Sequence, residues 1–253
     1  MSADLAPIAA QVEAGDPLRF AATMAAPAAL RPALWPVYAV NLELARAPWA
    51  AREPLLAEMR LQWWIDRLAA PDLPANAPPA LAALFEGPAK VRAALLGVAE
   101  ARRRDCHPDS PFARAEDLWA YLEATGGGVM RAAAAALGCD GGAALVDLGA
   151  AAALGGWLAA LPELDARGRP GLAPAGPRIT DLAQQGLARL DRAGDALLPA
   201  AWPLRAALLP AVDARAELRA ARARDAAGPL AGFSGSPFLR ALRRTRTGLT
   251  GML

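Results

Sequence analysis

The sequence predicts an all-α protein, folded as a single-domain helical bundle over residues 1–253. Proline and glycine divide the chain into segments that carry helical rather than strand periodicity. The composition is 55% hydrophobic but 6% aromatic and is rich in alanine, which favours helices over sheets. A chain of 253 residues is an ordinary length for one all-helical domain.

Three helices are expected in the first 70 residues. The first, over 16–24, opens with an N-cap aspartate followed by proline. The second runs over 27–46, and Pro32 and Pro36 should bend or restart it. The third, over 52–68, has one broad face that carries Leu55, Met59, Gln62, Trp63 and Asp66.

The middle of the chain contains two further helical regions. A proline-rich loop over 70–79 leads into the first region, which Pro88 breaks and three arginines end at 102–104. The second region, over 115–137, holds three consecutive glycines at 126–128. Each glycine costs about 1 kcal/mol in a helix interior relative to alanine, so a close helix approach or a bend at a pocket should compensate.

Four segments follow the middle region. A buried core helix is expected over 141–161, then a loop rich in glycine and proline over 162–177. An amphipathic helix is expected over 178–198, and shorter helical pieces over 202–224 and 236–246. The uncharged apolar run inside the core helix is 14 residues long (148–161), which is too short to span a bilayer.

Charge and cysteine content exclude several function classes. A net charge of +2 gives no reason to expect nucleic-acid binding, although nine arginines against three acids after residue 200 could approach anionic lipid or an acidic partner. Cys106 and Cys139 have no partner motif and fit free thiols in a reducing, cytoplasmic compartment. His107 is the only histidine and lies in a turn-like sequence, so a histidine-rich zinc site is poorly supported. The acidic N-terminal residues do not resemble a signal or transit peptide.

Seven short motifs occur in an order that resembles the squalene/phytoene synthase family, most strongly over 16–174. An all-helical continuation over 178–246 agrees with it. The motifs are the helix at Asp16, Arg31-Pro32-Ala33-Leu34, Tyr38-Ala39-Val40, Arg60-Leu61-Gln62-Trp63-Trp64, Asp117-Leu118-Trp119-Ala120-Tyr121, Gly127-Gly128-Val129, and Gly168-Arg169 before Pro174.

The resemblance implies an isoprenoid-synthase-like helical bundle around an apolar cavity. Enzymes of this family condense two prenyl diphosphates with the help of Mg²⁺, which two aspartate-rich motifs hold. Carried onto this chain, the first motif places its outer aspartates at Ala45 and Trp49. The second places them at Leu161 and Asp165, with Trp157 and Leu154 at two upstream polar positions. At most one of the four aspartates is therefore kept, and we expect no metal or other cofactor.

Two interpretations of the remaining acids stay open. If the protein is active, Glu43, Glu163 and Asp165 could form a rearranged Mg²⁺ site. Otherwise Glu43 is an ion-pair partner, for example of Arg60 in a buried pair, and the other two are loop acids. The sequence around Glu43 is similar to a degenerate branch of the family, which includes a mitochondrial assembly factor for respiratory complex I and its α-proteobacterial relatives.

The resemblance also supplies candidate ligand-binding residues. Trp63 could line the cavity or pack in the core, and we expect core packing. Arginines could hold a diphosphate or lipid phosphate without metal, because their guanidinium groups bind phosphate bidentately. These phosphate-binding candidates are Arg31, Arg46, Arg167 and Arg169. The pocket candidates are Tyr38, Asn41, Glu43, Arg60, Gln62, Trp63, Tyr121, Gly127 and Val129.

Three functions follow as hypotheses. The first is a non-catalytic binding or assembly factor, in peripheral contact with the inner membrane and acting on a respiratory-complex subunit. The second is an active prenyltransferase of terpenoid or carotenoid biosynthesis with a non-standard metal site. The third is a module that binds a prenyl lipid or prenyl diphosphate.

Overall fold

The protein is a bundle of helices, so the all-α prediction is confirmed. The structure is a computed structural model and describes residues 5–51, 53–107, 109–225 and 237–252. Within those ranges the extended backbone pairing is an isolated parallel bridge between Phe112 and Leu172. The α-helices are α1 (Ala6–Gly15), α2 (Pro17–Met24), α3 (Arg31–Arg46), α4 (Pro54–Ala69), α5 (Pro79–Phe85), α6 (Ala89–Ala101), α7 (Ala115–Leu122), α8 (Gly128–Ala136), α9 (Gly142–Ala166), α10 (Ile179–Leu197), α11 (Leu204–Leu208), α12 (Ala214–Asp225) and α13 (Pro237–Thr250).

Five shorter helical turns connect these helices. Four are 3-10 turns and the fifth, η4, is a π-helical turn between α7 and α8. The π-turn adds one residue per turn and is frequent at functional sites. The turns are η1 (Ala28–Leu30), η2 (Ala47–Trp49), η3 (Arg102–Cys106), η4 (Glu123–Gly127) and η5 (Leu209–Ala211).

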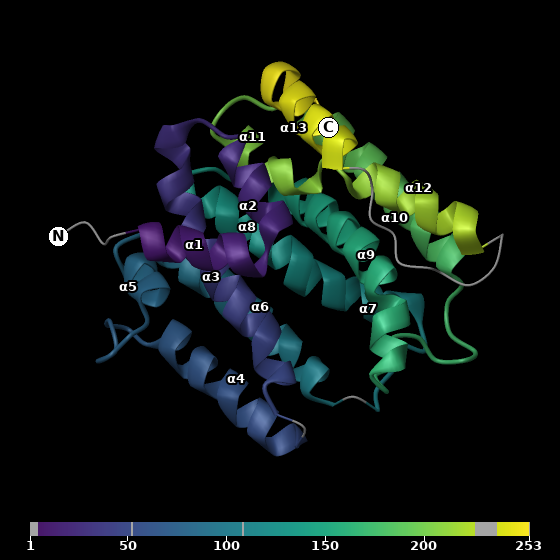
Figure 1. Cartoon of the computed structure of the whole chain (residues 1–253), viewed down its shortest axis with the longest axis horizontal. Coiled ribbons are helices and arrows are strands. Elements are labelled where there is room, and N and C mark those ends of the chain that lie inside the picture. Colours follow the sequence, from purple (N-terminus) through teal and green to yellow (C-terminus); the bar gives the residue numbers. More distant parts are fainter. Residues whose placement is uncertain (1–4, 52, 108, 226–236, 253) are drawn as a thin grey trace.

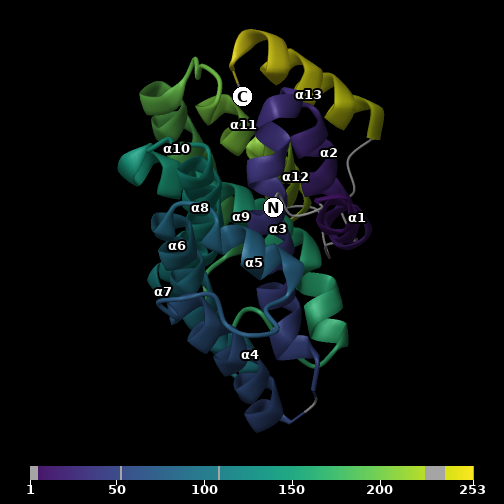
Figure 2. The same cartoon turned by 90° about the vertical axis from the view of Figure 1, so that its left-hand side faces the viewer.

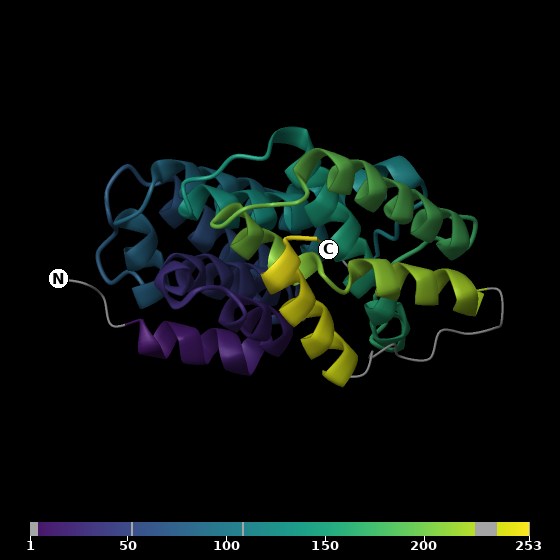
Figure 3. The same ribbon diagram turned by 90° about the horizontal axis from the view of Figure 1, so that it is seen from above.

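Helix α9 lies at the centre of the bundle and packs against α10, α12 and η4 (Figure 1). On the N-terminal side, α3 packs against α1, α5 and α8. Helices α4 and α13 lie at opposite ends of the molecule, which Figure 2 shows from a second direction. Seen from above, α13 lies between α2 and α12 (Figure 3). Near the C-terminal end of α13, the Arg205 guanidinium donates a hydrogen bond to the carbonyl oxygen of Gly248 at 2.8 Å.

Two of the three consecutive glycines, Gly126 and Gly127, allow η4 and α9 to approach closely. A Cβ atom at Gly126 would lie 2.3 Å from the Cβ of Ala153 and 2.6 Å from the carbonyl oxygen of Gly149. A Cβ at Gly127 would lie 2.7 Å from Val146. Of the two compensations that were expected for these glycines, the structure shows the close helix approach.

The end of α9 differs from the prediction. A loop was expected from Pro162, but the helix continues through that proline to Ala166 and is 25 residues long. Proline removes one backbone hydrogen bond, and here burial of Leu161 and packing of Leu164 against the core hold the last turn in place.

The expectation that this segment is too short to span a bilayer is also corrected. By length and composition α9 could cross a membrane, and half of its most apolar window is buried inside the bundle. Its contacts with α10, α12 and η4 are those of a core helix.

Two further features of the N-terminal half were not anticipated. Helix α1 was not predicted, although Ile8 and Val12 lie one turn apart and are both buried. On α4 the expectation for Trp63 was wrong: Trp63 is 36% exposed, and Trp64 is the core residue at 6%. The side chain of Trp63 stacks with Arg67, whose guanidinium carbon lies 3.5 Å from a ring centroid.

Two helices were expected to begin at Arg52 and at Ser236. Both of these residues lie outside the described residues.

Candidate functional site

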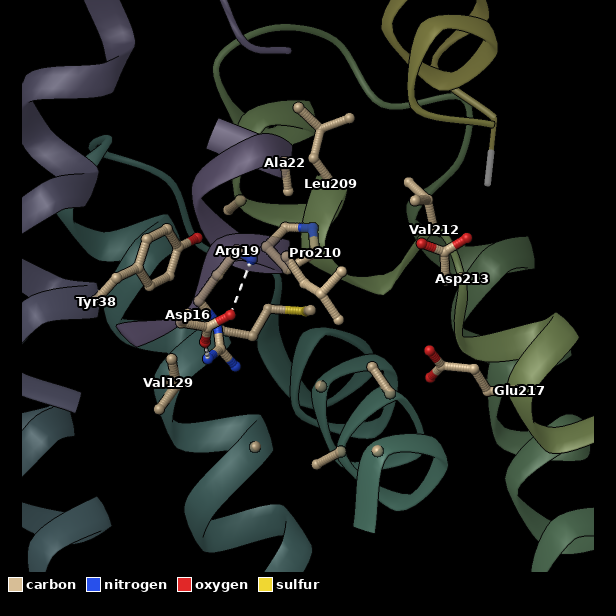
Figure 4. A pocket seen from close by; sticks show the side chains of 18 of the residues that line it. Asp16, Arg19, Ala22, Tyr38, Val129, Leu209, Pro210, Val212, Asp213 and Glu217 are labelled. Carbon is tan, nitrogen blue, oxygen red and sulfur yellow. Dashed lines mark hydrogen bonds and ion pairs between the residues drawn. The ribbon is translucent and has the colours of Figure 1, made fainter. Parts of the chain in front are cut away.

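A cavity of about 320 Å³ lies between the N-terminal helices, the centre of α9 and the C-terminal segment (Figure 4). Its wall contains apolar and small residues from α8 and α9 and charged residues from α2, α12 and α13. The lining residues are Asp16, Leu18, Arg19, Ala22, Tyr38, Gly126, Val129, Met130, Gly149, Ala152, Ala153, Gly156, Trp157, Ala207, Leu209, Pro210, Val212, Asp213, Glu217 and Arg244.

Tyr38 lies on α3 and forms part of the cavity wall (Figure 4). The residue is 2% exposed, and its Oη atom has no hydrogen-bond partner. Burial raises the pKa of Tyr38 to about 12, against the opposing effect of the Arg19 guanidinium. The phenol is therefore protonated at neutral pH.

Asp16 and Arg19 form the part of the wall next to Tyr38. Asp16 caps α2, because its Oδ1 accepts a hydrogen bond from the backbone N–H of Arg19 at 2.9 Å. The side chains of the two residues also form an ion pair. The Arg19 guanidinium carbon lies 5.5 Å from the ring centroid of Tyr38. The positive charge of Arg19 is thus already matched by an acid within the same turn.

The opposite wall carries Asp213 and Glu217, two acids that α13 covers with arginines. Arg243 donates to Asp213 at 2.7 Å, Arg244 lies 3.6 Å from the same carboxylate, and Arg240 lies between Asp213 (3.9 Å) and Glu217 (3.8 Å). Three arginines of the basic C-terminal region therefore point into the bundle, rather than toward an external lipid or partner.

Burial, together with the nearby charge of Asp213, raises the pKa of Glu217, and this gives a pH-dependent prediction. A carboxyl group with a raised folded-state pKa lowers stability when it is ionised. That cost is present above the folded pKa and disappears below the unfolded value of about 4.3. We expect Glu217→Gln to raise the melting temperature at pH 7 and to have no effect below about pH 4. Melting curves across this pH range check it, and a larger gain at the acidic end would contradict it.

The positions to which the resemblance assigns the family's metal-binding aspartates do not fit a Mg²⁺ site. Ala45 and Leu161 have no donor atom, and Leu161 is buried in the core. Trp49 packs under Arg169, with 4.3 Å between the guanidinium carbon and a ring centroid. Asp165 is exposed at the end of α9. Across the described ranges, no three His, Cys, Asp or Glu side chains gather closely enough to hold a metal ion.

The other candidate acids have neighbours of their own. Glu43 accepts a hydrogen bond from Gln11 at 2.8 Å and lies 3.7 Å from Arg46. The expected buried pair between Glu43 and Arg60 is wrong, because Arg60 is exposed on α4. Glu163 is exposed and pairs with Arg167. These acids do not fit a shared Mg²⁺ site.

The four phosphate-binding candidates make other contacts, and none of them lines the cavity. Arg31 donates to the carbonyls of Ala26 and Met24, both at 2.9 Å, and so caps the end of α2. Arg169 donates to the carbonyl of Asp105 at 2.8 Å. Arg46 and Arg167 form the pairs with Glu43 and Glu163. The cavity is lined instead by Arg19 and Arg244.

Of the nine pocket candidates, Tyr38 and Val129 line the cavity. Gly127 lies behind the wall against α9, and the remaining six lie outside the lining. Asn41 is buried one turn after Tyr38, and its Oδ1 atom has no hydrogen-bond partner. Tyr121 donates to Asp105 at 2.9 Å. Glu43 contacts Gln11, Gln62 contacts Asp66 and Arg103, and Arg60 and Trp63 are on the exposed side of α4.

Sequence reasoning missed Arg19, Asp213, Glu217 and Arg244 as cavity residues. The available signal was the spacing of Asp213 and Glu217, four residues apart in a segment otherwise rich in arginine. Such spacing places two side chains on one helix face. It does not reveal which other helix the face meets, so their position in the cavity wall could not be predicted.

The order of the helices defines an all-α protein with the isoprenoid synthase fold. The chain belongs to the squalene/phytoene synthase family, whose sequence model matches residues 12–243. The resemblance found in the motifs is thereby confirmed at the level of the family.

Two solved structures show the same fold. A squalene synthase HpnC from Alicyclobacillus acidocaldarius aligns with a TM-score of 0.67 at 18% identity, over 88% of this chain and 94% of the other. A dehydrosqualene synthase in complex with ligand aligns with a TM-score of 0.74 at 16% identity, over 97% of this chain and 95% of the other. No curated protein matches the chain.

Proposed function

We propose that this protein is a non-catalytic member of the squalene/phytoene synthase family, which keeps the cavity of the fold as a binding site and works at a membrane surface. The observation that carries the proposal is the replacement of the metal-binding positions. Ala45, Trp49 and Leu161 stand where the family places carboxylates, and the diphosphate chemistry of the family requires a metal to neutralise the leaving group.

The surroundings of these positions support the same conclusion. If other residues had replaced the lost aspartates in a metal site, their oxygen atoms would lie close together. Here Glu43 is held by Gln11 and Arg46, Glu163 is held by Arg167, and Asp165 extends outward. Glu43 and Glu163 therefore take part in local contacts, and Asp165 is exposed.

The outer face of α13 supports action at a membrane surface. Its arginines at 240, 243 and 244 face the bundle, whereas Leu239, Leu242 and Leu249 face outward, with Leu249 80% exposed. An apolar helix face of this kind suits insertion into the boundary between headgroups and acyl chains. The proposed location is the cytoplasmic face of the inner membrane. A respiratory-complex subunit is the proposed partner there, on the strength of the similarity to the degenerate branch of the family.

The catalytic part of the proposal is tested with purified protein, Mg²⁺ and farnesyl or geranylgeranyl diphosphate. We expect no diphosphate release above the protein-free background, while an active squalene synthase in the same assay releases it. Turnover that is abolished by Glu43→Gln would overturn the proposal and would establish the active prenyltransferase with a rearranged metal site.

The assembly part is tested by deleting the gene and measuring complex I activity in isolated membranes. We expect reduced activity that the wild-type gene restores. Unchanged complex I activity with an altered lipid profile would instead favour a role in lipid binding.

A further inference from the structure

We infer that a groove between α12 and α13 binds the phosphate of an anionic phospholipid headgroup. The groove has a volume of about 220 Å³ and lies where the two helices run past each other (Figure 3). This inference rests on the proposed function, because it names the lipid chemistry that would hold the protein at a membrane surface. The lining residues are Val212, Arg215, Ala216, Arg219, Arg243, Arg246 and Thr247.

Four arginines line the groove, two from each helix. Arg215 and Arg219 are four residues apart on α12, and Arg243 and Arg246 are three residues apart on α13. Either spacing places two side chains on one face of a helix, where like charges repel each other. No acidic residue lines the groove within the described part of the chain. A bound anion would therefore relieve the repulsion between the guanidinium groups.

Two of these arginines have no carboxylate to neutralise them. Arg215 and Arg243 each have a carboxylate oxygen 2.7 Å from their Nη1 atom. Arg219 and Arg246 are exposed, and neither side chain forms an ion pair or a hydrogen bond with another described residue. Arginine presents a planar fork of N–H donors that matches two oxygens of a phosphate. The groove thus has both the surplus charge and the donors that a phosphate requires.

The position of Arg246 connects the groove to an apolar surface. Arg246 lies four residues after Leu242 and three before Leu249, so these side chains are neighbours on one face of α13. Leu242 is 56% exposed and Leu249 is 80% exposed. A phospholipid offers both chemistries, because its phosphate can occupy the groove while its acyl chains contact the leucines. A free phosphate would use the groove alone.

The rest of the outer face of α13 favours a lipid over an acidic protein surface. Arg246 is the one charged residue among the exposed residues from 241 to 250. The other exposed residues in this range are Ala241, Leu242, Thr245, Leu249 and Thr250. A face with one cation among apolar and small side chains suits the boundary between headgroups and acyl chains. It lacks the further charges that an acidic protein surface would pair with.

The inference is tested by sedimentation of the full chain with two kinds of vesicle, phosphatidylcholine alone and phosphatidylcholine mixed with phosphatidylglycerol. We expect tighter binding to the mixed vesicles. Arg219→Gln and Arg246→Gln should each weaken that binding about 5-fold, and about 25-fold together, the usual contribution of cations close to an anionic membrane. The melting temperature should stay unchanged, because neither side chain loses a contact with a described residue.

Arg60 and Arg192 provide the matched control. Both are exposed, on α4 and α10 respectively, and neither lines the groove. Replacing both with glutamine removes the same net charge as the groove double variant, and it should leave the preference for mixed vesicles unchanged. An equal loss of binding in the two double variants would show that net charge, and not the groove, attracts the membrane, and would overturn the inference.

Inorganic phosphate, measured by calorimetry, distinguishes a lipid site from a site for a free anion. We expect it to bind more weakly than the mixed vesicles, because it makes no contact with the leucines of α13. Phosphate binding as tight as vesicle binding, or equal affinity for the two kinds of vesicle, would overturn the inference and leave a membrane role of the apolar face standing.

Two further outcomes separate this inference from the proposed function. Equal affinity for both vesicles, together with loss of complex I activity in cells that carry the groove double variant, would identify an acidic protein as the occupant and overturn the lipid inference alone. The absence of binding to either kind of vesicle would overturn the proposed membrane location as well.

Discussion

Replacing Gly149 with alanine is expected to lower the free energy of unfolding by about 3 kcal/mol, the upper part of the range for overpacked sites. Gly149 lies on α9 where this helix meets η4. A Cβ atom there would lie 2.7 Å from the carbonyl oxygen of Gly126 and 2.8 Å from the Cα of Gly127. Both are backbone atoms, so relief requires that one helix moves away from the other. Chemical denaturation of the variant and the wild type measures the difference.

Gly156, two turns further along the same helix, is the matched control. A Cβ atom there meets nothing within 4 Å. Gly156→Ala should therefore raise the free energy of unfolding by up to about 1 kcal/mol, since alanine loses less backbone entropy in a helix. Equal effects of the two substitutions would show that helix propensity, and not the close approach of η4 and α9, determines the outcome.

The close contact between η4 and α9 was predicted from the sequence only in part. Three glycines inside a helix predicted a close approach or a bend at a pocket, because something had to offset their cost. The sequence could not identify the partner, since Gly149 lies on another helix. Pro162 illustrates the opposite case: its local preference ends a helix, but tertiary packing of Leu161 and Leu164 overrides that preference.

The candidate site likewise contains residues that the sequence could place and residues that it could not. Motif spacing proposed Tyr38 and Val129 as pocket residues, and both line the cavity in the structure. Helical periodicity grouped Trp63 with Leu55 and Met59 on one face of α4, but periodicity does not say which face is buried. In the structure this face is exposed. The C-terminal wall was missed because it depends on where α12 and α13 pack, which no local pattern encodes.

Asp213→Asn is expected to destabilise the protein by about 3 kcal/mol, because loss of one partner from a buried ion pair leaves the other charge uncompensated. Asp213 is 8% exposed and is the acid that Arg240, Arg243 and Arg244 share. Asparagine keeps the shape but not the charge, so three guanidinium groups would remain with Glu217 alone. The loss should be concentrated at α13, whose arginines make these contacts.

Hydrogen exchange and denaturant unfolding together check this expectation, with Asp191→Asn as the control. Asp191 pairs with Arg215 at 2.7 Å, the same distance that separates Asp213 from Arg243, but its side chain is 60% exposed. An exposed pair contributes about 0–1 kcal/mol, because water screens it. Asp213→Asn should therefore speed amide exchange throughout α13, whereas Asp191→Asn should leave it unchanged. If both variants leave exchange at α13 unaltered, the arginines do not hold this helix against the bundle, and contacts at its C-terminal end, such as the hydrogen bond from Arg205 to Gly248, must hold it instead.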